Sequence, residues 1–227
     1  MLYLQNANSV TTTEIYEPYL QPNDVISIII SSENPEIVAP YNLIDVSLKV
    51  DESLGNQNIQ TYIIDKNGNI EFPIIGSIKI GGLPKSEAIE KIKTILKDHV
   101  KDAVVNLRIL NFKVSVLGEV AKPNTYTVNS ERITLLEALS LAGDLTIYGN
   151  RKTVMLIREK EGNKEIQKID ITKPNFISSP YYYLAQNDVI YVEPNKTRVN
   201  SAAIGPNITI GISALSLIVT IIALTTK

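Results

Sequence analysis

The last part of the chain constrains its folding most, because it is long, apolar and uncharged. Residues 199–226 contain no charged side chain, and residues 208–224 are almost wholly apolar. A helix over this last part, beginning near Pro206, would be roughly 30 Å long, which matches the hydrocarbon thickness of a bilayer. The sequence therefore predicts one transmembrane helix over residues 206–227, reached through a linker at residues 197–205.

Four hydroxyl side chains form a stripe along this predicted helix: Thr209, Ser213, Ser216 and Thr220. They are spaced four, three and four residues apart, and aliphatic side chains occupy the opposite face. In one interpretation several copies of the chain stand in a ring, and the stripe lines a lumen or the seams between neighbours. In the other, a single anchor helix bonds its hydroxyls to its own carbonyl groups. The stripe taken alone favours the single anchor.

The whole sequence has 227 residues, of which 44% are hydrophobic. The part before the predicted membrane helix is therefore long enough to bury two small hydrophobic cores. The net charge is −2 and no basic run occurs, which excludes the charge pattern of a nucleic-acid-binding protein. With no cysteine and His99 as the one histidine, we expect no disulfide, no metal site and no cofactor. Residues 1–18 are polar and lack the features of a signal peptide, so we expect a cytoplasmic start or a leader already removed.

Two segments of the chain resemble each other and predict the start of a strand. Residues 19–30, "YLQPNDVISIII", pass from turn-forming residues into a β-branched run. Residues 183–194, "YLAQNDVIYVEP", repeat Tyr, Leu, Asn, Asp, Val and Ile at the same offsets. We call these the strand-leading segments, and their repetition indicates two related modules or a matched beginning and end.

The first predicted module covers residues 19–111. The run "TYIIDKNGNIEFPIIG" predicts two short strands joined by a turn at residues 65–68, where Asn and Gly tolerate the positive φ of a tight hairpin. A helix follows, with Pro84 in its first turn. Its predicted apolar face consists of Ala88, Ile89, Ile92, Ile95 and Leu96. Residues 103–110 add a further strand.

The second predicted module covers residues 112–196. It opens with a strand, a Gly118-Glu119 break and a Pro123-Asn124 turn. Thr134 and Glu137 form a capping box before an apolar helix, which Gly143 ends in a left-handed conformation. Strands predicted at residues 153–158, 165–170 and 188–192 complete a mixed sheet around one helix, a β-grasp-like architecture. The predicted fold class is therefore α+β, with two small mixed-sheet modules followed by one C-terminal transmembrane helix.

These motifs together resemble the bacterial polysaccharide export family of outer-membrane proteins. The first module's "YLQPNDVISI" and "DKNGNIEFPIIGSIKIGGLPKSEAIEKI" are similar to the family's export domain. The second module's "VSVLGEVAKPNTYTV" and "TLLEALSLAGDLTIYGNRKTVMLIR" are similar to its soluble-ligand-binding β-grasp domain. The resemblance covers about residues 19–194, in the family's order. Members usually carry a lipidated N-terminal cysteine, which this sequence lacks, and Pro123-Asn124 replaces the family's Pro-Gly turn. Asn is an acceptable replacement because it tolerates left-handed geometry.

The resemblance implies which residues carry the family's motifs. The export-module motif falls on Asp65, Gly68, Pro73, Gly76 and Gly82. The β-grasp motif falls on Gly118, Glu119, Pro123, Glu137 and Gly143.

The resemblance also implies a function. It favours the ring over the single anchor: a homo-oligomeric channel that exports capsular or extracellular polysaccharide through the outer membrane of a Gram-negative bacterium, with its soluble modules in the periplasm. The expected partners are the polysaccharide, the lipid bilayer, other copies of the chain and an inner-membrane polymerisation or chain-length protein, but no nucleic acid. The alternative is a monomeric membrane-anchored module that binds a saccharide or another small ligand.

No catalytic constellation is present in the sequence. There is no nucleophile elbow, no phosphate-binding glycine-rich loop with lysine and no zinc-ligand spacing. Glu119, Glu137 and Asp144 provide carboxylates near turns, but capping explains Glu137 and the family's turn explains Glu119. We therefore expect a protein that is not an enzyme. Eleven tyrosines offer aromatic faces for a hydrated polymer, although most tyrosines in such folds fill half-buried strand positions.

Overall fold

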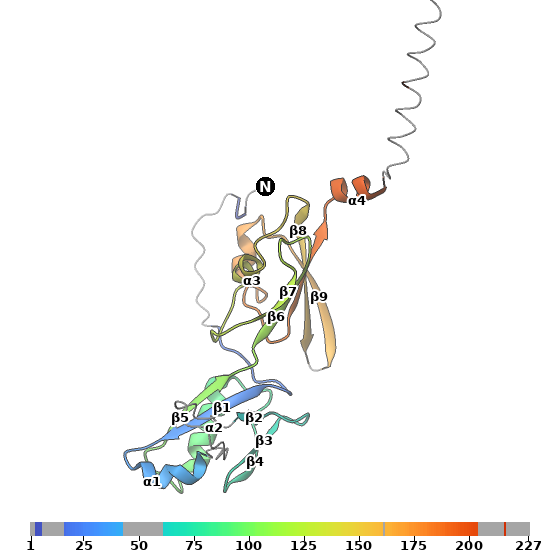
Figure 1. Cartoon of the computed structure of the whole chain (residues 1–227). Helices are drawn as coiled ribbons and strands as arrows, with labels where there is room; N and C mark the ends of the chain where they lie inside the picture. Colours follow the sequence, from blue (N-terminus) through green and yellow to red (C-terminus); the bar gives the residue numbers. More distant parts are fainter. Residues whose placement is uncertain (1–2, 6–15, 43–60, 161, 204–215, 217–227) are drawn as a thin grey trace, which may run out of the picture.

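The chain folds around two hydrophobic cores that follow each other along the sequence. The computed structural model describes residues 3–5, 16–42, 61–160, 162–203 and 216. One core is built from buried side chains between Leu20 and Leu107, and the other from buried side chains between Phe112 and Val192. Figure 1 shows the two modules one after the other, with strands and helices in each. The α+β class with two modules is confirmed.

The first module is a small antiparallel sheet with one long helix against it. Its strands are β1 (Val25–Ser31), β2 (Thr61–Ile63) and β5 (Val104–Ile109), with β1 in the centre. Helix α2 (Lys85–Leu96) lies against β5. After β1 come the short helix α1 (Pro35–Val38) and the 3-10 turn η1 (Ala39–Tyr41). The predicted helix face is confirmed, because its buried residues are Ala88, Ile92 and Leu96.

The strands on either side of residues 65–68 do not pair with each other as a simple hairpin. Strand β2 pairs with β1, whereas β3 (Asn69–Phe72) pairs with β4 (Gly76–Lys79) in a separate two-stranded sheet. The predicted hairpin was therefore wrong in its pairing, although its strands and its turn exist. The cause is a contact distant in sequence: the Gly68 carbonyl accepts the backbone N–H groups of Ile80 and Gly81 at 2.9 and 2.8 Å, which holds the end of β4 beside the turn.

Helix α2 has an N-terminal cap that comes from far away in the chain. Its N-cap residue, Pro84, makes no side-chain capping bond. Instead the Glu17 carboxylate accepts the Ser86 backbone N–H and, at 2.9 Å, the Ser86 hydroxyl. A carboxylate at this position also interacts favourably with the positive end of the helix dipole. The segment before the first module is thus part of its structure.

The second module is a five-stranded mixed sheet around one short helix. The strands are β6 (Lys113–Gly118), β7 (Asn124–Thr127), β8 (Gly149–Lys160), β9 (Asn163–Ile169) and β10 (Val189–Pro194). Their order in the sheet is β7-β6-β10-β8-β9, and only the central pair of β6 and β10 is parallel. Helix α3 (Leu135–Leu141) buries Leu135, Ala138 and Leu139 in the core. The mixed sheet around one helix is as the sequence predicts.

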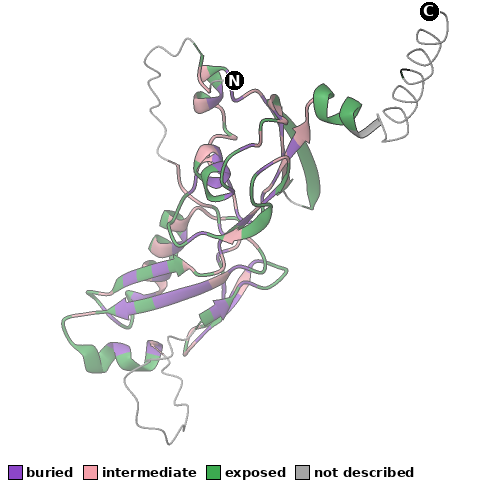
Figure 2. Cartoon of the chain, turned by 45° about the horizontal axis from the view of Figure 1, so that its top comes forward, coloured by how far each residue is buried: buried purple, intermediate pink, exposed green. Residues whose placement is uncertain are grey.

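Burial follows the pleat of the strands. Along β1 the side chains of Ile26, Ile28 and Ile30 are buried on one face. On the other face Ile29 is 41% exposed and Ser31 is exposed, whereas Ser27 is buried. Figure 2 shows buried and exposed stretches following one another along the ribbons of both modules. The 3-10 turn η2 (Pro174–Ser178) closes the second core with buried Phe176.

The chain leaves the second module through helix α4 (Lys196–Ala203), which follows β10 directly. Within the described residues, no helix is both long and apolar enough to cross a bilayer. The predicted helix at residues 206–227 lies, apart from Ser216, outside the described residues. Ser216 itself is helical and exposed.

Candidate functional site

The two strand-leading segments adopt the same local geometry. Asn23 and Asn187 both have positive φ, at 69° and 63°. The next residues, Asp24 and Asp188, are each 1% exposed. In both segments one carboxylate oxygen accepts, at 2.8 Å, the backbone N–H three residues earlier in the chain. The sequence similarity therefore reflects a repeated structural unit, a buried aspartate at the start of a central strand.

The two buried aspartates differ in their electrostatic partners. Asp188 receives Arg158, whose Nε lies 3.0 Å from Oδ1 and whose Nη2 lies 2.7 Å from Oδ2. Burial raises the pKa of the Asp188 carboxyl, and the Arg158 guanidinium opposes that rise. Asp24 has no such cation: its Oδ1 is buried and makes no hydrogen bond to any described residue. Burial raises the pKa of Asp24 to about 6.

The raised pKa of Asp24 predicts a specific dependence of stability on pH. The folded chain binds this proton more tightly than the unfolded chain, whose aspartate titrates near pH 3.8. The stabilisation from the protonated carboxyl is therefore fully present below about pH 4 and is lost as pH rises through about 6, at a cost of roughly 1–3 kcal/mol. Asp24→Asn should remove this loss, which urea unfolding between pH 4.5 and pH 7 will measure. Asp98→Asn, which neutralises an exposed carboxylate, should keep the loss of stability between pH 4.5 and pH 7. If the free energy of unfolding of Asp24→Asn fell with pH as steeply as that of the wild type, Asp24 would not be its source.

The two strand-leading segments meet at Asn111, where one module ends and the other begins. The Asn111 side chain accepts the Val25 N–H at 3.0 Å and donates to the Asn23 carbonyl at 3.1 Å. On the other side, the buried Gln186 amide donates to the Asn111 carbonyl at 2.7 Å and accepts the Lys113 N–H at 2.8 Å. The junction is thus bonded to both repeats, which restrains the angle between the modules.

Gly118 and Glu119 of the predicted β-grasp motif lie where β6 ends. Gly118 has φ of +88°, and a Cβ there would stand 2.2 Å from the Val192 carbonyl oxygen of β10. Only glycine allows this close approach. The Glu119 carboxylate accepts the Thr146 hydroxyl at 2.8 Å and pairs with Arg198 of α4 at 3.3 Å. Glu119 therefore contacts α4, the helix that follows the last strand of the second module.

The remaining β-grasp motif residues have structural roles. The predicted capping box is confirmed, since the Glu137 backbone N–H bonds the Thr134 hydroxyl at 3.2 Å and the Glu137 carboxylate accepts the Thr134 backbone N–H at 2.7 Å. Gly143 has φ of +73°, as predicted. Pro123 is exposed in the turn before β7. Asn124 does not adopt a left-handed φ; it is the first residue of β7, so the predicted left-handed replacement for glycine was wrong.

The predicted export-module motif shapes the turns around β3 and β4. The Asp65 carboxylate accepts the N–H groups of Asn67 and Asn69 at 2.8 and 2.7 Å, which closes the turn. Gly68, Gly76 and Gly82 all have positive φ near +85°. Pro73 begins the exposed β3–β4 tip, where its carbonyl accepts the Ile75 N–H at 2.7 Å. None of these side chains meets those of the β-grasp motif at a common centre.

Three of the four residues in the predicted hydroxyl stripe lie outside the described residues, namely Thr209, Ser213 and Thr220. Ser216, the fourth, is exposed and helical. The assignment of the stripe to a lumen or a seam stays a prediction.

An aromatic cluster forms where the chain before the first module crosses onto the second. Tyr16 stacks on Tyr183 with ring centroids 4.7 Å apart, and its hydroxyl donates to the Leu184 carbonyl at 2.9 Å. Arg132 lies 5.5 Å from the centroid of the Tyr183 ring, and Tyr182 packs edge-on against it at 5.0 Å. Burial raises the pKa of Tyr16 to about 12, so its hydroxyl stays a donor. These tyrosine contacts hold the segment at Tyr16 against the second module.

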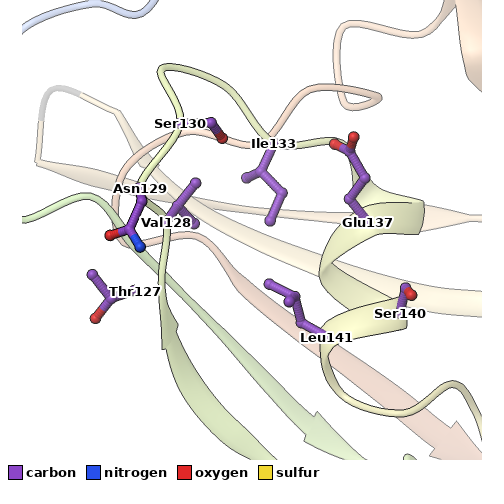
Figure 3. Close-up of a pocket in the computed structure, with 8 residues that line it drawn as sticks. All are labelled: Thr127, Val128, Asn129, Ser130, Ile133, Glu137, Ser140 and Leu141. Carbon is purple, nitrogen blue, oxygen red and sulfur yellow. The ribbon is translucent and has the colours of Figure 1, made fainter.

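A shallow hollow opens beside the helix of the second module. It has a volume of about 460 Å³, and Figure 3 shows its lining of Thr127, Val128, Asn129, Ser130, Ile133, Glu137, Ser140 and Leu141. Val128 and Ile133 are buried apolar residues, whereas Leu141 is 48% exposed. Hydroxyl and amide groups surround this apolar floor. An apolar floor with polar groups at its rim is the general arrangement of a small-ligand site.

Several important residues carry no signal in the sequence. Arg158, Glu17 and Asn111 act on partners 30, 69 and 86 residues away. Asp188 and Arg198 had a partial signal: the former lies in a repeated segment, and the latter is the last charged residue before the uncharged C-terminal part.

Comparisons with known proteins agree with this architecture. Residues 13–110 match the family described as polysaccharide biosynthesis/export protein, and residues 112–192 match the SLBB domain. The chain is 27% identical over 186 residues to the EPS I polysaccharide export outer membrane protein EpsA of Ralstonia solanacearum, an alignment covering 79% of this chain and 48% of the relative. It is 30% identical over 148 residues to the protein of the same name from Ralstonia nicotianae (strain ATCC BAA-1114 / GMI1000), covering 62% and 39%. The chain spans about half the length of these curated relatives or less.

The fold and these motifs define a two-module α+β protein of the export class, with an export domain followed by an SLBB domain. The chain belongs to the bacterial polysaccharide export protein family. This confirms the family that the sequence motifs indicate.

Proposed function

We propose that this chain is a subunit of a homo-oligomeric channel through which capsular or extracellular polysaccharide leaves the cell across the outer membrane. The observation that carries the proposal is the order of parts: an export domain, an SLBB domain and then an apolar stretch without charge. The relatives' printed names, polysaccharide export outer membrane protein, support both the substrate class and the location. In this proposal the export module is residues 19–111, the β-grasp module residues 112–196, and the two face the periplasm.

The proposed membrane part is a ring of helices, one from each chain over residues 206–227. A single helix has no room for a polymer, but several helices enclose a lumen while each satisfies its own backbone hydrogen bonds. The stripe of Thr209, Ser213, Ser216 and Thr220 then faces the lumen or the neighbouring helix, and the aliphatic face meets lipid. Hydroxyl groups suit a neutral hydrated polymer, because they exchange hydrogen bonds with it without binding it by charge.

The soluble modules provide the surface for an inner-membrane partner. A polymer that crosses two membranes needs a continuous path, so we propose contact with a polymerisation or chain-length protein on the periplasmic side. The bonded junction at Asn111 supports this role, because it gives the two modules a defined relative angle.

The hollow beside α3 supports a second candidate, a monomeric membrane-anchored module that binds a saccharide. Its apolar floor and its rim of Asn129, Ser130 and Glu137 are a small-ligand arrangement. The two candidates differ in a measurable way, since a binding module retains saccharide but lets none through.

Release of a neutral dextran from liposomes tests the proposal. Full-length chain reconstituted into dextran-loaded vesicles should release the polymer, and the variant that ends at Gly205 should not. Replacing the four stripe residues by leucine should abolish release, while leucine at Ile208 and Ile212 on the opposite face should preserve it. Retention of dextran by full-length chain, together with saturable saccharide binding, would favour the second candidate.

A further inference from the structure

Helix α4 lies at the end of the second module remote from the first (Figures 1 and 2). Residues 196–201 of this helix are all exposed. A helix of eight residues whose described side chains, at residues 196–201, are all exposed has little stability of its own. Contacts at its start and along its side must therefore fix its direction.

The start of α4 is bonded to the loop before β8 through Asn195. The Asn195 backbone N–H donates to the Tyr148 carbonyl at 2.7 Å, and its side-chain amide donates to the Ile147 carbonyl at 3.3 Å. Its side-chain oxygen accepts the Arg198 N–H at 3.0 Å, which is the geometry of a helix N-cap. One residue thus caps the helix and ties it to the module.

The side of α4 is held by Arg198. Its Nε lies 3.3 Å from a Glu119 carboxylate oxygen, and its guanidinium lies 5.3 Å from the centroid of the Tyr148 ring. The other Glu119 oxygen accepts the Thr146 hydroxyl at 2.8 Å, and that hydroxyl in turn accepts the Tyr148 N–H at 3.2 Å. These contacts close a ring of hydrogen bonds and one ion pair, which we call the α4 latch. Its residues are Glu119, Thr146, Tyr148, Asn195 and Arg198.

The latch contributes orientation rather than stability. The Arg198 side chain is 56% exposed, and ion pairs this exposed add little to the free energy of unfolding. A cation that contacts a carboxylate and an aromatic face together, however, allows few positions for the helix that carries it. Glu119 is well suited to the role, because its backbone is fixed by bonds to Val192 and Thr146.

We propose that the α4 latch sets the direction in which the chain leaves the second module, and that Glu119 and Arg198 are its positioning residues. The importance of this direction for a channel rests on the proposed function. Only residues 204–205 lie between α4 and the predicted membrane helix. The direction of α4 therefore aims each helix at the shared ring. Loss of the latch should leave both modules folded while the C-terminal segments point in many directions.

Distances between two spin labels test the latch directly. The chain has no cysteine, so Ser201→Cys on α4 and Lys168→Cys on β9 give one labelled pair, with labelled chain diluted in an excess of unlabelled chain. Arg198→Ala and Glu119→Gln should each widen the distance distribution by about twofold or more, because the helix is then held at its start alone. Lys196→Ala, which removes a cation from the same helix, should leave it narrow.

The outcomes separate this inference from the proposed function. The latch is overturned if Arg198→Ala leaves the distribution of spin-label distances unchanged, even if the chain forms a ring. It is also overturned if Lys196→Ala widens that distribution as much as Arg198→Ala does. A narrow wild-type distribution that widens in both latch variants, with urea unfolding unchanged, supports the latch even if the chain is a monomer.

Discussion

Asp188→Asn is expected to destabilise the second module by about 3–5 kcal/mol, since it leaves the Arg158 guanidinium without its counter-charge. The Asp188 side chain is 0% exposed and that of Arg158 is 18% exposed, so water reaches only part of the guanidinium and not the position of the lost carboxylate. Asparagine keeps the shape, and its amide oxygen can still accept the Ala185 N–H. Its amide NH2 then faces the Arg158 Nε–H, so the substitution removes the charge and also one hydrogen-bond acceptor. Urea unfolding at pH 7 measures the difference.

A double variant provides the control for this prediction. Arg158→Met with Asp188→Asn removes both charges and should recover most of the lost stability, because an apolar side chain at position 158 carries no uncompensated charge. If Asp188→Asn cost less than about 1 kcal/mol, or if the double variant were as unstable as the single one, the pair would not have the role assigned to it.

Gly118→Ala should destabilise the second module by about 3–5 kcal/mol, since two penalties add at this position. A left-handed φ of +88° strains any L side chain, and the new Cβ would overlap the Val192 carbonyl oxygen at 2.2 Å. Relief requires β6 and β10 to separate at the centre of the sheet. The midpoint of urea unfolding and the dispersion of the amide spectrum both report this change.

Gly162→Ala is the matched control for Gly118→Ala. Gly162 lies in the same module with φ of +79°, but a Cβ there meets nothing within 4 Å. It should cost only about 1 kcal/mol, the conformational part of the penalty. Equal losses in the two variants would show that the approach of β6 to β10 is not what requires glycine.

Local features of the fold could be predicted from the sequence. The capping box at Thr134 and Glu137 and the left-handed Gly143 involve residues within one or two helical turns, so their spacing in the sequence is their spacing in space. The apolar face of α2 and the strands of the second module followed from periodicity for the same reason.

Features that depend on distant contacts could not be predicted. Asp65–Gly68 is a turn by its composition, but which strands pair around it depends on where Ile80 and Gly81 return. The cap of α2 comes from Glu17, and no local rule places a carboxylate there. Asp188 was recognised as part of a repeat, whereas its pairing with Arg158 depends on the register of β8 against β10.

In the candidate site, too, local features could be predicted from the sequence and contacts between distant residues could not. The sequence predicted Glu119 as a motif residue, but its contact with Arg198 required the loop at Thr146 and the start of α4 to be placed in space. The hydroxyl stripe rests on spacing alone and stays a prediction.

The mass of the detergent-solubilised chain tests the central claim most directly. Native mass spectrometry of full-length chain should show one discrete high-order multiple of its 25.1 kDa mass. The same chain without residues 206–227 should show smaller species, because the proposed helix ring is gone. A monomer in both forms would contradict the channel.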